Sequence, residues 1–428
     1  MGSSLSRRRV LAVTAAGTLT PVLAGCGALA AADSDADTLV IHNQMGGTAI
    51  GAPTFHAAVA DFRRENPGVD VKLLVNGDDL APVYETSRLA RKEADIVIVN
   101  LYDKTLEWTA VDATVPVGDY LDRWGLRERV VPQALQQWTD ADGRLRAFPY
   151  FASNWPVAYN MDLLRDVGLT EPPTSTDQLV DAARLLRAKR RAPVAVGGND
   201  WTGQKLLFQI IQTHLTAEQA QHVFATGDFS AVPGAGEGIE HFTDLRDAGV
   251  FADNAQGLTS DSMTTQYNTG QAAVMSALSS ALARVPAATA AQTVVGGWPV
   301  PAGSAHSHPT VMRSYSLAGL WISPNGTQKP ELIEKFVRFM YRPHTVSRFV
   351  TEAGRDMAVR TDTTSPDFPL VTAAKELTDN VVSQVLLPDL LIPARANQAL
   401  IQATSTAFTP GTNANAIRGA LESAYRRV

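Results

Sequence analysis

Short apolar runs alternate with segments of helical spacing in the first part of the chain. Residues 38–42, 69–75 and 94–99 have the pattern of buried or half-buried strands. Residues 55–62 place aromatic and aliphatic side chains at helical spacing, and residues 82–93 are expected to form a helix. Strands that alternate with helices predict a mainly parallel sheet, in which ligands bind beyond the carboxyl ends of the strands.

The later part of the chain again mixes helical and strand patterns. Residues 193–198 predict a strand that runs into a loop, and residues 205–214 predict a helix. The Ala-rich residues 270–291 are expected to begin as a helix. Residues 315–323 predict another apolar strand, and Pro330 starts a helix at the position that proline favours.

The first 26 residues have the pattern of an export signal. Three arginines at residues 7–9 precede residues 10–24, an apolar stretch that is too short for a membrane-spanning helix. The stretch ends in Leu-Ala-Gly-Cys at residues 23–26, which resembles the lipobox of bacterial lipoproteins. The resemblance implies a signal peptide of residues 1–25 and a lipid on Cys26, the single cysteine of the chain. An ordinary signal peptide with an incidental cysteine is the alternative interpretation.

The export route stays open between two possibilities. Ser-Arg-Arg-Arg-Val-Leu at residues 6–11 resembles a twin-arginine motif, although Val10 stands where that motif prefers Phe. Ordinary secretory signals also begin with clustered arginines. Residues 27–37 are small, Ala-rich and acidic, so residues 26–37 are expected to form a lipidated, flexible tether.

The charge balance excludes some partners. The chain has a net charge of −6, and its first 25 residues contribute three arginines and no acid, so the remainder is more acidic still. That balance argues against nucleic acid and anionic lipid surfaces as partners. The lipid on Cys26 is therefore the only membrane attachment that we expect. The length that remains after cleavage predicts two or three domains.

Several different short motifs follow one another in a defined order over nearly the whole chain after the tether. The most specific are Asp-Gly-Arg-Leu-Arg-Ala-Phe-Pro at residues 142–149, Tyr-Asn at residues 159–160 and Pro-Pro-Thr at residues 172–174. In this order and spacing they resemble the family 1 extracellular solute-binding proteins, the carbohydrate-type binding proteins of ABC importers. The other segments that carry the resemblance are residues 61–71, 94–97, 268–273, 297–301, 317–320 and 353–360.

The resemblance implies an α/β fold of the periplasmic-binding-protein type, with two lobes, three crossings between them and a ligand cleft. The crossings are expected near residues 148–153, 313–316 and 355–359. Hinge bending would close the lobes over a ligand that contacts both of them. The implied lobes are residues 38–148 with 316–356, and residues 149–315 with 357–428.

The resemblance also implies a function. The protein would capture a small polar solute, a sugar or oligosaccharide, and deliver it to ABC permease subunits at the outer face of the cytoplasmic membrane. It would act as a monomer without a cofactor or a metal ion.

Carbohydrate sites need aromatic rings for the apolar sugar faces and amide, carboxylate or guanidinium groups for the hydroxyls. Such residues lie here where the family places its contacts. The candidates are Asn43, Gln44, Tyr102, Asp103, Asn154, Trp155, Trp201, Trp298, Tyr315 and Arg355. Each has a structural alternative, because a tryptophan is most often a packing residue and Arg355 is able to pair with Asp356 or brace the hinge.

One feature of the sequence weakens the assignment of a sugar as the ligand, and another weakens the alternative that the protein is an enzyme. Residues 278–280 read Leu-Ser-Ser where sugar-binding members commonly carry an aromatic residue, so a polyol, an amino sugar or a non-sugar ligand becomes an alternative. The chain has no Gly-x-Ser-x-Gly nucleophile motif and no Gly-rich phosphate loop, and His306 and His308 lack an acidic partner for zinc. A secreted glycan hydrolase and a structural lipoprotein without a ligand remain the alternatives to a binding protein.

Overall fold

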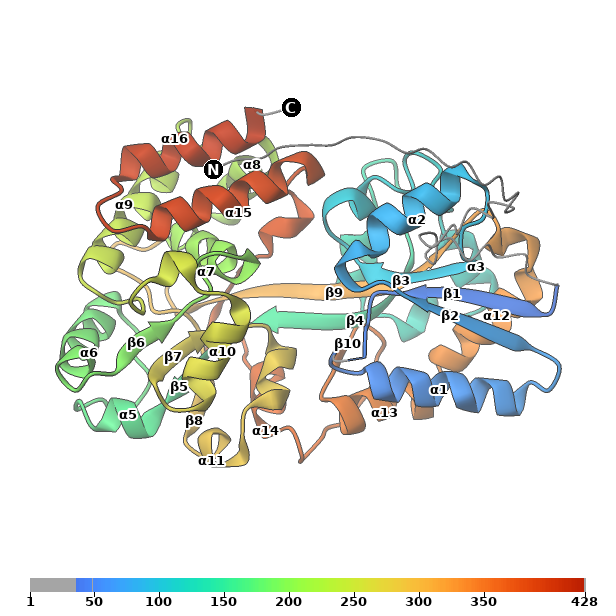
Figure 1. Cartoon of the computed structure of the whole chain (residues 1–428), viewed down its shortest axis with the longest axis horizontal. Helices are drawn as coiled ribbons and strands as arrows, with labels where there is room; N and C mark the ends of the chain where they lie inside the picture. Colours follow the sequence, from blue (N-terminus) through green and yellow to red (C-terminus); the bar gives the residue numbers. More distant parts are fainter. Residues whose placement is uncertain (1–35, 48, 427–428) are drawn as a thin grey trace, which may run out of the picture.

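The computed structural model describes residues 36–47 and 49–426, and it arranges them around two β-sheets (Figure 1). The larger sheet has seven strands in the order β10-β4-β9-β3-β1-β2, with β11 beside β9. These strands are β1 (Thr38–Asn43), β2 (Asp70–Val75), β3 (Ile96–Asn100), β4 (Phe148–Trp155), β9 (Thr310–Ile322), β10 (Asp356–Met357) and β11 (Ser383–Leu386). The smaller sheet has the order β6-β7-β5-β8. Its strands are β5 (Val157–Asn160), β6 (Ala192–Ala195), β7 (Ala272–Ser276) and β8 (Thr293–Gly296).

Helices surround both sheets and divide into two lobes, which lie to the right and left in Figure 1. The first lobe contains α1 (Ala52–Glu65), α2 (Leu80–Leu89), α3 (Gly118–Arg123), α4 (Pro132–Trp138), α12 (Pro330–Met340) and α13 (Pro343–Ala353). The second lobe contains α5 (Met161–Arg165), α6 (Thr176–Ala188), α7 (Trp201–Gln212), α8 (Ala217–Thr226), α9 (Pro233–Asp247), α10 (Ser260–Asn268), α11 (Ala287–Ala290), α14 (Pro369–Lys375), α15 (Ala394–Phe408) and α16 (Ala414–Arg426).

The first lobe forms as its apolar pattern predicts. β1 pairs in parallel with β2 on one side and with β3 on the other, which confirms parallel pairing for these three strands. The prediction of a mainly parallel sheet was wrong for the sheet as a whole, because β9 pairs antiparallel with both β3 and β4 and makes the sheet mixed. Phe62 of α1 packs edge-on against Phe336 and Phe339 of α12, with ring centroids 5.2 and 5.4 Å apart. The predicted helix that starts at Pro330 is also confirmed. The carboxyl ends of β1 and β3 therefore meet at one edge of the sheet.

The antiparallel pair β4 and β9 runs through the centre of the molecule and belongs to both lobes (Figure 1). One end of the 13-residue β9 pairs with β3 in the first lobe, and its other end pairs with β11. The pleat of β4 places successive side chains on opposite faces of this pair. Phe151 consequently lines a cavity on one face, and Ala152 lines a cavity on the other.

One prediction in the second lobe was wrong in part. Residues 270–291 were expected to begin as a helix, but Ala272–Ser276 form strand β7, which pairs with β5 and β6. All five residues of β7 are buried. Alanine favours helices when its surroundings are equal, but here the burial and hydrogen bonds of a central strand outweigh that weak preference. A short 3₁₀ helix, Ser279–Arg284, follows β7 directly.

We propose that the lobes divide close to the limits expected from the sequence. The main core of the first lobe takes its buried residues from 39–151 and 318–359, and that of the second lobe takes them from 157–298 and 392–425. Residues 357–359 pack into the first core, so the third crossing on this proposal leaves the first lobe a few residues later than residue 356.

The predicted signal peptide, Cys26 and most of the tether fall within residues 1–35 and lie outside the described residues. None of the helices that the structure describes combines the length and the apolar character needed to cross a bilayer.

The close packing of β4 on β9 predicts a strong effect of a single methyl group at Gly319. A Cβ atom built there would lie 2.6 Å from the Phe148 carbonyl oxygen and 2.7 Å from the ring of Trp138. Since neither backbone nor buried indole can move freely, we expect Gly319→Ala to lower the free energy of unfolding by about 1 to 3 kcal/mol. Denaturant unfolding followed by circular dichroism measures it.

Gly236→Ala provides the matched control. Gly236 lies in α9, and a Cβ atom built there meets nothing within 4 Å. Alanine is the better helix former by about 1 kcal/mol, so this variant should be neutral or more stable. Equal stability of the two variants would contradict the packing argument.

Candidate functional site

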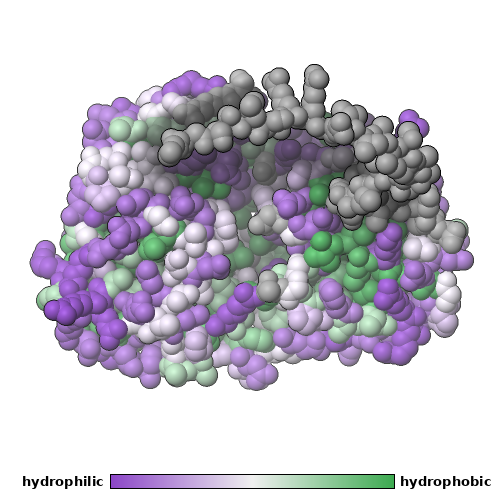
Figure 2. Space-filling model, in the orientation of Figure 1, coloured by the Kyte–Doolittle hydropathy of each residue, from purple (hydrophilic) through white to green (hydrophobic). Residues whose placement is uncertain are grey.

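A cavity of about 490 Å³ lies between the two lobes, and Figure 2 shows the surface hollowed between the two halves of the molecule. Its walls come from the strand ends of the first lobe, from the crossing strands and from the second lobe. The lining residues are Gln44, Met45, Gly46, Ala49, Ile50, Gly77, Ile98, Val99, Asn100, Phe151, Trp201, Leu278, Ser280, Ala281, Arg284, Leu317, Ala318 and Arg355. We call this cavity the cleft.

Gln44 is the central polar group on the wall of the first lobe. It directly follows β1, and its side-chain oxygen accepts a hydrogen bond from the Asn100 backbone N–H at the end of β3, 3.2 Å away. Its amide nitrogen donates to the Tyr102 hydroxyl at 2.9 Å. Tyr102 lines a smaller adjoining cavity of about 230 Å³ that shares Gln44 with the cleft. The meeting of two parallel strand ends thus fixes the orientation of these polar groups.

Trp201 provides the aromatic surface on the opposite wall. It is the first residue of α7 and is 44% exposed, whereas most of the other tryptophans are almost fully buried. The ring of Trp155 supports it from behind in an edge-on contact, with centroids 5.5 Å apart. An exposed indole held on a buried one is a suitable platform for the apolar face of a ligand.

The residues before Trp201 fix the start of α7. Asp200 caps the helix and accepts hydrogen bonds from the Thr202 backbone N–H at 2.9 Å and from the Thr202 hydroxyl at 2.6 Å. Its second oxygen accepts from the Ser260 backbone N–H. A Cβ atom at Gly197 would lie 2.3 Å from the Thr202 hydroxyl oxygen, so the loop needs glycine there. The sequence around Trp201 therefore holds the ring in a fixed position.

Arg355 lies at the third crossing and faces the cleft. Its guanidinium carbon is 4.4 Å from the centroid of the Phe151 ring, and its Nε atom is buried without a hydrogen-bond partner. Burial lowers the pKa of Arg355 to about 10, and the negative charge of Asp356 opposes that shift. The side chain is therefore still a cation at neutral pH.

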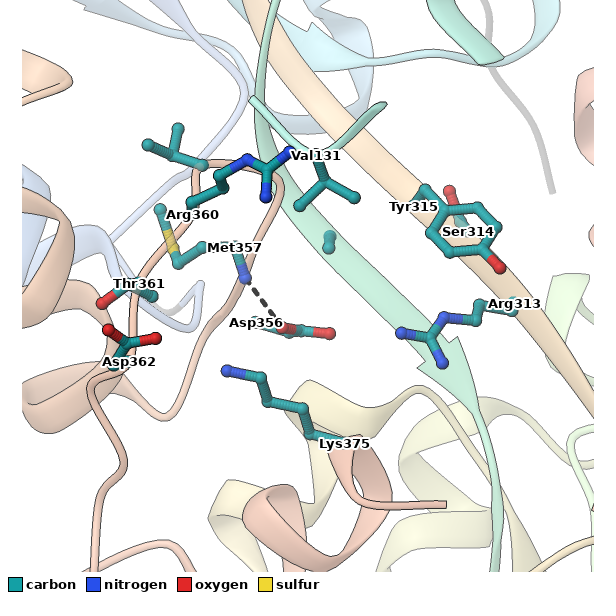
Figure 3. A pocket seen from close by; sticks show the side chains of 12 residues that line it. Val131, Arg313, Ser314, Tyr315, Asp356, Met357, Arg360, Thr361, Asp362 and Lys375 are labelled. Carbon is teal, nitrogen blue, oxygen red and sulfur yellow. Dashed lines mark hydrogen bonds between the residues drawn. The ribbon is translucent and has the colours of Figure 1, made fainter. Parts of the chain in front are cut away.

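A second cavity of about 460 Å³ lies on the other face of the crossing strands (Figure 3). Figure 3 shows the Asp356 carboxylate between Arg313 and Lys375, and one of its oxygens accepts a hydrogen bond from the Met357 backbone N–H at 2.9 Å. Burial raises the pKa of Asp356, and the charges of Lys375 and Arg313 work against that rise. This cavity contains charges of both signs, and no tryptophan is among its described lining residues.

The structure brings four of the predicted site residues together. Gln44, Trp201 and Arg355 line the cleft, and Tyr102 lies next to it through its hydrogen bond with Gln44. The side chain of Asp103 lies outside the described residues.

The other predicted residues lie elsewhere. Trp298 has no exposed surface and packs in the core of the second lobe, and Trp155 is 1% exposed behind Trp201. Asn43 is buried and accepts from the Met45 backbone N–H, whereas Asn154 is buried and donates to the Ala374 carbonyl. Tyr315 bonds to Gln384 and lines the cavity behind the crossing strands.

Part of the segment that follows β7 was not predicted as a site, namely Ala281 and Arg284. They line the cleft together with Leu278 and Ser280, which lie where the family resemblance placed an aromatic contact. Had residues 272–276 been recognised as a strand, the rule that ligands bind beyond strand ends would have found this segment. Within residues 36–47 and 49–426 no group of three or more His, Cys, Asp or Glu side chains is arranged to hold a metal ion.

Two α/β lobes with a cleft at their crossing strands define a class, the bilobal binding proteins. Residues 47–345 match the model of the family described as bacterial extracellular solute-binding protein. The chain belongs to this family, as the sequence motifs indicated. No curated protein matches the chain.

Solved structures agree with this family and fold. The crystal structure of a probable secreted solute-binding lipoprotein from Streptomyces coelicolor is 67% identical with a TM-score of 0.84, over 92% of this chain and 100% of the other. A chitin oligosaccharide binding protein is 20% identical with a TM-score of 0.78, over 91% and 98% of the two chains. Maltose-bound MalE3 of T. maritima is 15% identical with a TM-score of 0.72, over 91% and 99%.

The position of Trp201 predicts that Trp201→Ala weakens the binding of any solute that stabilises the protein. Loss of the aromatic surface should cost about 1 to 2 kcal/mol, a roughly five- to thirtyfold rise in Kd, because the ring contributes both area and its π face. Isothermal titration measures Kd. Leu185→Ala is the control, because Leu185 is 48% exposed and is not among the residues that line the cleft. Equal affinity of both variants would show that Trp201 is not a contact.

Proposed function

We propose that this protein is an exported, lipid-anchored receptor that captures a small polar solute in the cleft and passes it to the permease of an ABC importer. A carbohydrate is the proposed class of solute. Membership of the extracellular solute-binding family supports capture and transport, and the Leu-Ala-Gly-Cys motif at residues 23–26 supports the lipid on Cys26. The secreted lipoprotein of Streptomyces coelicolor, at 67% identity, supports export and the anchor. We further propose that the protein acts as a monomer.

The main support for this proposal is that the walls of the cleft come from both lobes and from the crossing between them. Gln44 comes from the first lobe, Trp201 comes from the second, and Arg355 comes from the crossing between them. A solute that contacts all three binds better when the lobes are closed than when they are apart, because only the closed arrangement makes every contact at once. A receptor needs such closure to report that it is loaded.

The composition of the cleft supports capture without turnover. Its described lining residues include no Asp, Glu, His or Cys. Glycoside hydrolysis uses a pair of carboxylates, and general acid–base catalysis in most enzymes uses one of these same side chains. We therefore propose Gln44, Tyr102, Trp201 and Arg355 as ligand contacts rather than as catalytic residues.

A thermal unfolding screen tests the proposal. The protein, with Cys26 replaced by serine, is heated with a panel of mono- and oligosaccharides, polyols and amino acids. A ligand that binds only the folded state stabilises it by about 2.7 kcal/mol at a hundredfold excess over Kd, so a selective rise in Tm is expected. Product formation from a bound glycan would contradict capture, and a flat result over the whole panel would count against a solute-binding role.

The lipid anchor makes a separate prediction. Cys26→Ser removes the only thiol of the chain, so the variant should move from the membrane fraction to the soluble exported fraction. The mass of the amino-terminal peptide should show a diacylglycerol on Cys26 in the wild type and none in the variant. Retention of the variant in the membrane fraction would contradict the proposed anchor.

A further inference from the structure

The charge of the cleft differs from that of the chain as a whole. The chain has a net charge of −6, yet the charged groups among the described lining residues of the cleft are two arginines, Arg284 and Arg355. Carboxylates, which only accept hydrogen bonds when ionised, are absent from the described lining residues of the cleft. The polar uncharged groups here are Gln44, Asn100 and Ser280. Arg355, which lines the cleft without an ion pair, favours a ligand that brings a negative charge.

Three contacts hold the Arg355 side chain in position at the cleft. Its backbone N–H donates to the Phe349 carbonyl at 3.0 Å, which fixes the start of the side chain. Its aliphatic stem passes beside Gly51, where an added Cβ atom would lie 3.7 Å from Cγ. The guanidinium then rests on the Phe151 ring. Backbone, glycine and ring together hold the cation in one place.

The local ion-pair alternative does not account for Arg355. Asp356 is its sequence neighbour, but no ion pair within 4.0 Å joins Arg355 to any carboxylate of the described residues. The Asp356 carboxylate lies instead in the cavity on the other face, near Arg313 and Lys375 (Figure 3). The protein leaves the buried Nε atom of Arg355 without a hydrogen-bond partner, so no side-chain or carbonyl acceptor of the described residues accounts for the position of this cation.

The beginning of α1 adds to the positive potential beside Arg355. Gly46, Ala49 and Ile50 line the cleft immediately before this 14-residue helix. Its first turn contains no acidic residue, and Gly51, at φ 88°, caps it without a side chain. The amino-terminal end of a helix carries a partial positive charge that favours anions. Helix and arginine thus act on the same part of the cleft.

We propose that the solute bound in this cleft carries an anionic oxyacid group, a carboxylate or a phosphate, which the Arg355 guanidinium binds while an apolar face of the solute rests on Trp201. The proposal rests on the proposed function and specifies its solute as an acidic sugar. A planar guanidinium offers paired N–H donors that match two oxygens of either group.

Matched pairs of solutes test the proposal and distinguish the two sources of charge. The probes are glucuronate and galacturonate oligosaccharides, their neutral gluco- and galacto-counterparts, and sugar phosphates, each titrated calorimetrically. The acidic member of a pair should bind roughly ten- to a hundredfold more tightly than the neutral one. The preference should shrink at high salt, because screening weakens the ion pair. The series that binds more tightly, uronate or phosphate, identifies the group.

Variants assign the preference to Arg355. Arg355→Gln should remove most of the preference, because it should weaken the binding of the acidic member of each pair much more than that of the neutral one. Arg355→Lys keeps the charge without the paired donors and should restore part of it. Arg360→Gln is the matched control, since Arg360 is exposed and lines the opposite cavity. The same loss of charge at this position should change neither the affinity for acidic sugars nor that for neutral sugars.

The outcomes separate this inference from the proposed function. If neutral sugars bind as tightly as acidic ones, or if Arg355→Gln weakens both classes equally, the inference is wrong and the receptor function stands. If no probe of any class binds the wild-type protein, both the receptor function and the inference are contradicted. Should Arg355→Gln fail to fold, Arg355→Lys and the salt dependence still decide the question.

Discussion

The antiparallel pair of β4 and β9 is the constraint on which the rest of the structure depends. β9 continues from its partner β3 in the first lobe to its partner β11 at the second, and β4 follows it over the whole distance. Gly319 allows the contact to be close, because the Phe148 carbonyl and the Trp138 ring occupy the space that a side chain would need. The two lobes are therefore joined by hydrogen-bonded strands whose faces point in fixed directions.

Those fixed directions separate the charges of the hinge. Neighbouring residues along an extended segment face opposite sides, so Phe151 and Arg355 line the cleft while Ala152 and Asp356 line the cavity behind it. An arginine and an aspartate that are adjacent in sequence would usually neutralise each other. Here the strand geometry directs the carboxylate toward Lys375 and Arg313 and leaves the guanidinium on the side of the cleft.

The sequence predicted the fold well because its strongest signals are local. Parallel strands such as Ile96–Asn100 are buried on both faces and read as continuous apolar runs, and α1 shows a clear helical period. β7 was missed because five small and apolar residues have no period that separates a strand from a helix. Only its partners β5 and β6, which are distant in sequence, determine its conformation.

The site was predictable to the extent that topology determines it. Gln44 was found because it follows a parallel strand, yet Asn43, one residue earlier, points inward because the pleat alternates. Trp155, Trp201 and Trp298 are the same residue type among similar polar neighbours, but their exposures are 1%, 44% and 0%. Only tertiary packing determines that Trp201 is exposed at the cleft, that Trp155 supports it from behind and that Trp298 lies in the core.

The division of the site among three parts of the molecule has a consequence for selectivity. Gln44 belongs to the first lobe, Trp201 belongs to the second, and Arg355 belongs to the crossing between them. A solute without a partner group for one of these three residues would lose that contact. It would also lose part of the difference in affinity between the closed and the separated lobes, and only that difference drives closure. A solute with a polar edge, an apolar face and a charged group placed together satisfies all three. On the proposed function, such a protein would select by how completely a solute closes it, and a tightly held partial ligand would still leave the lobes apart.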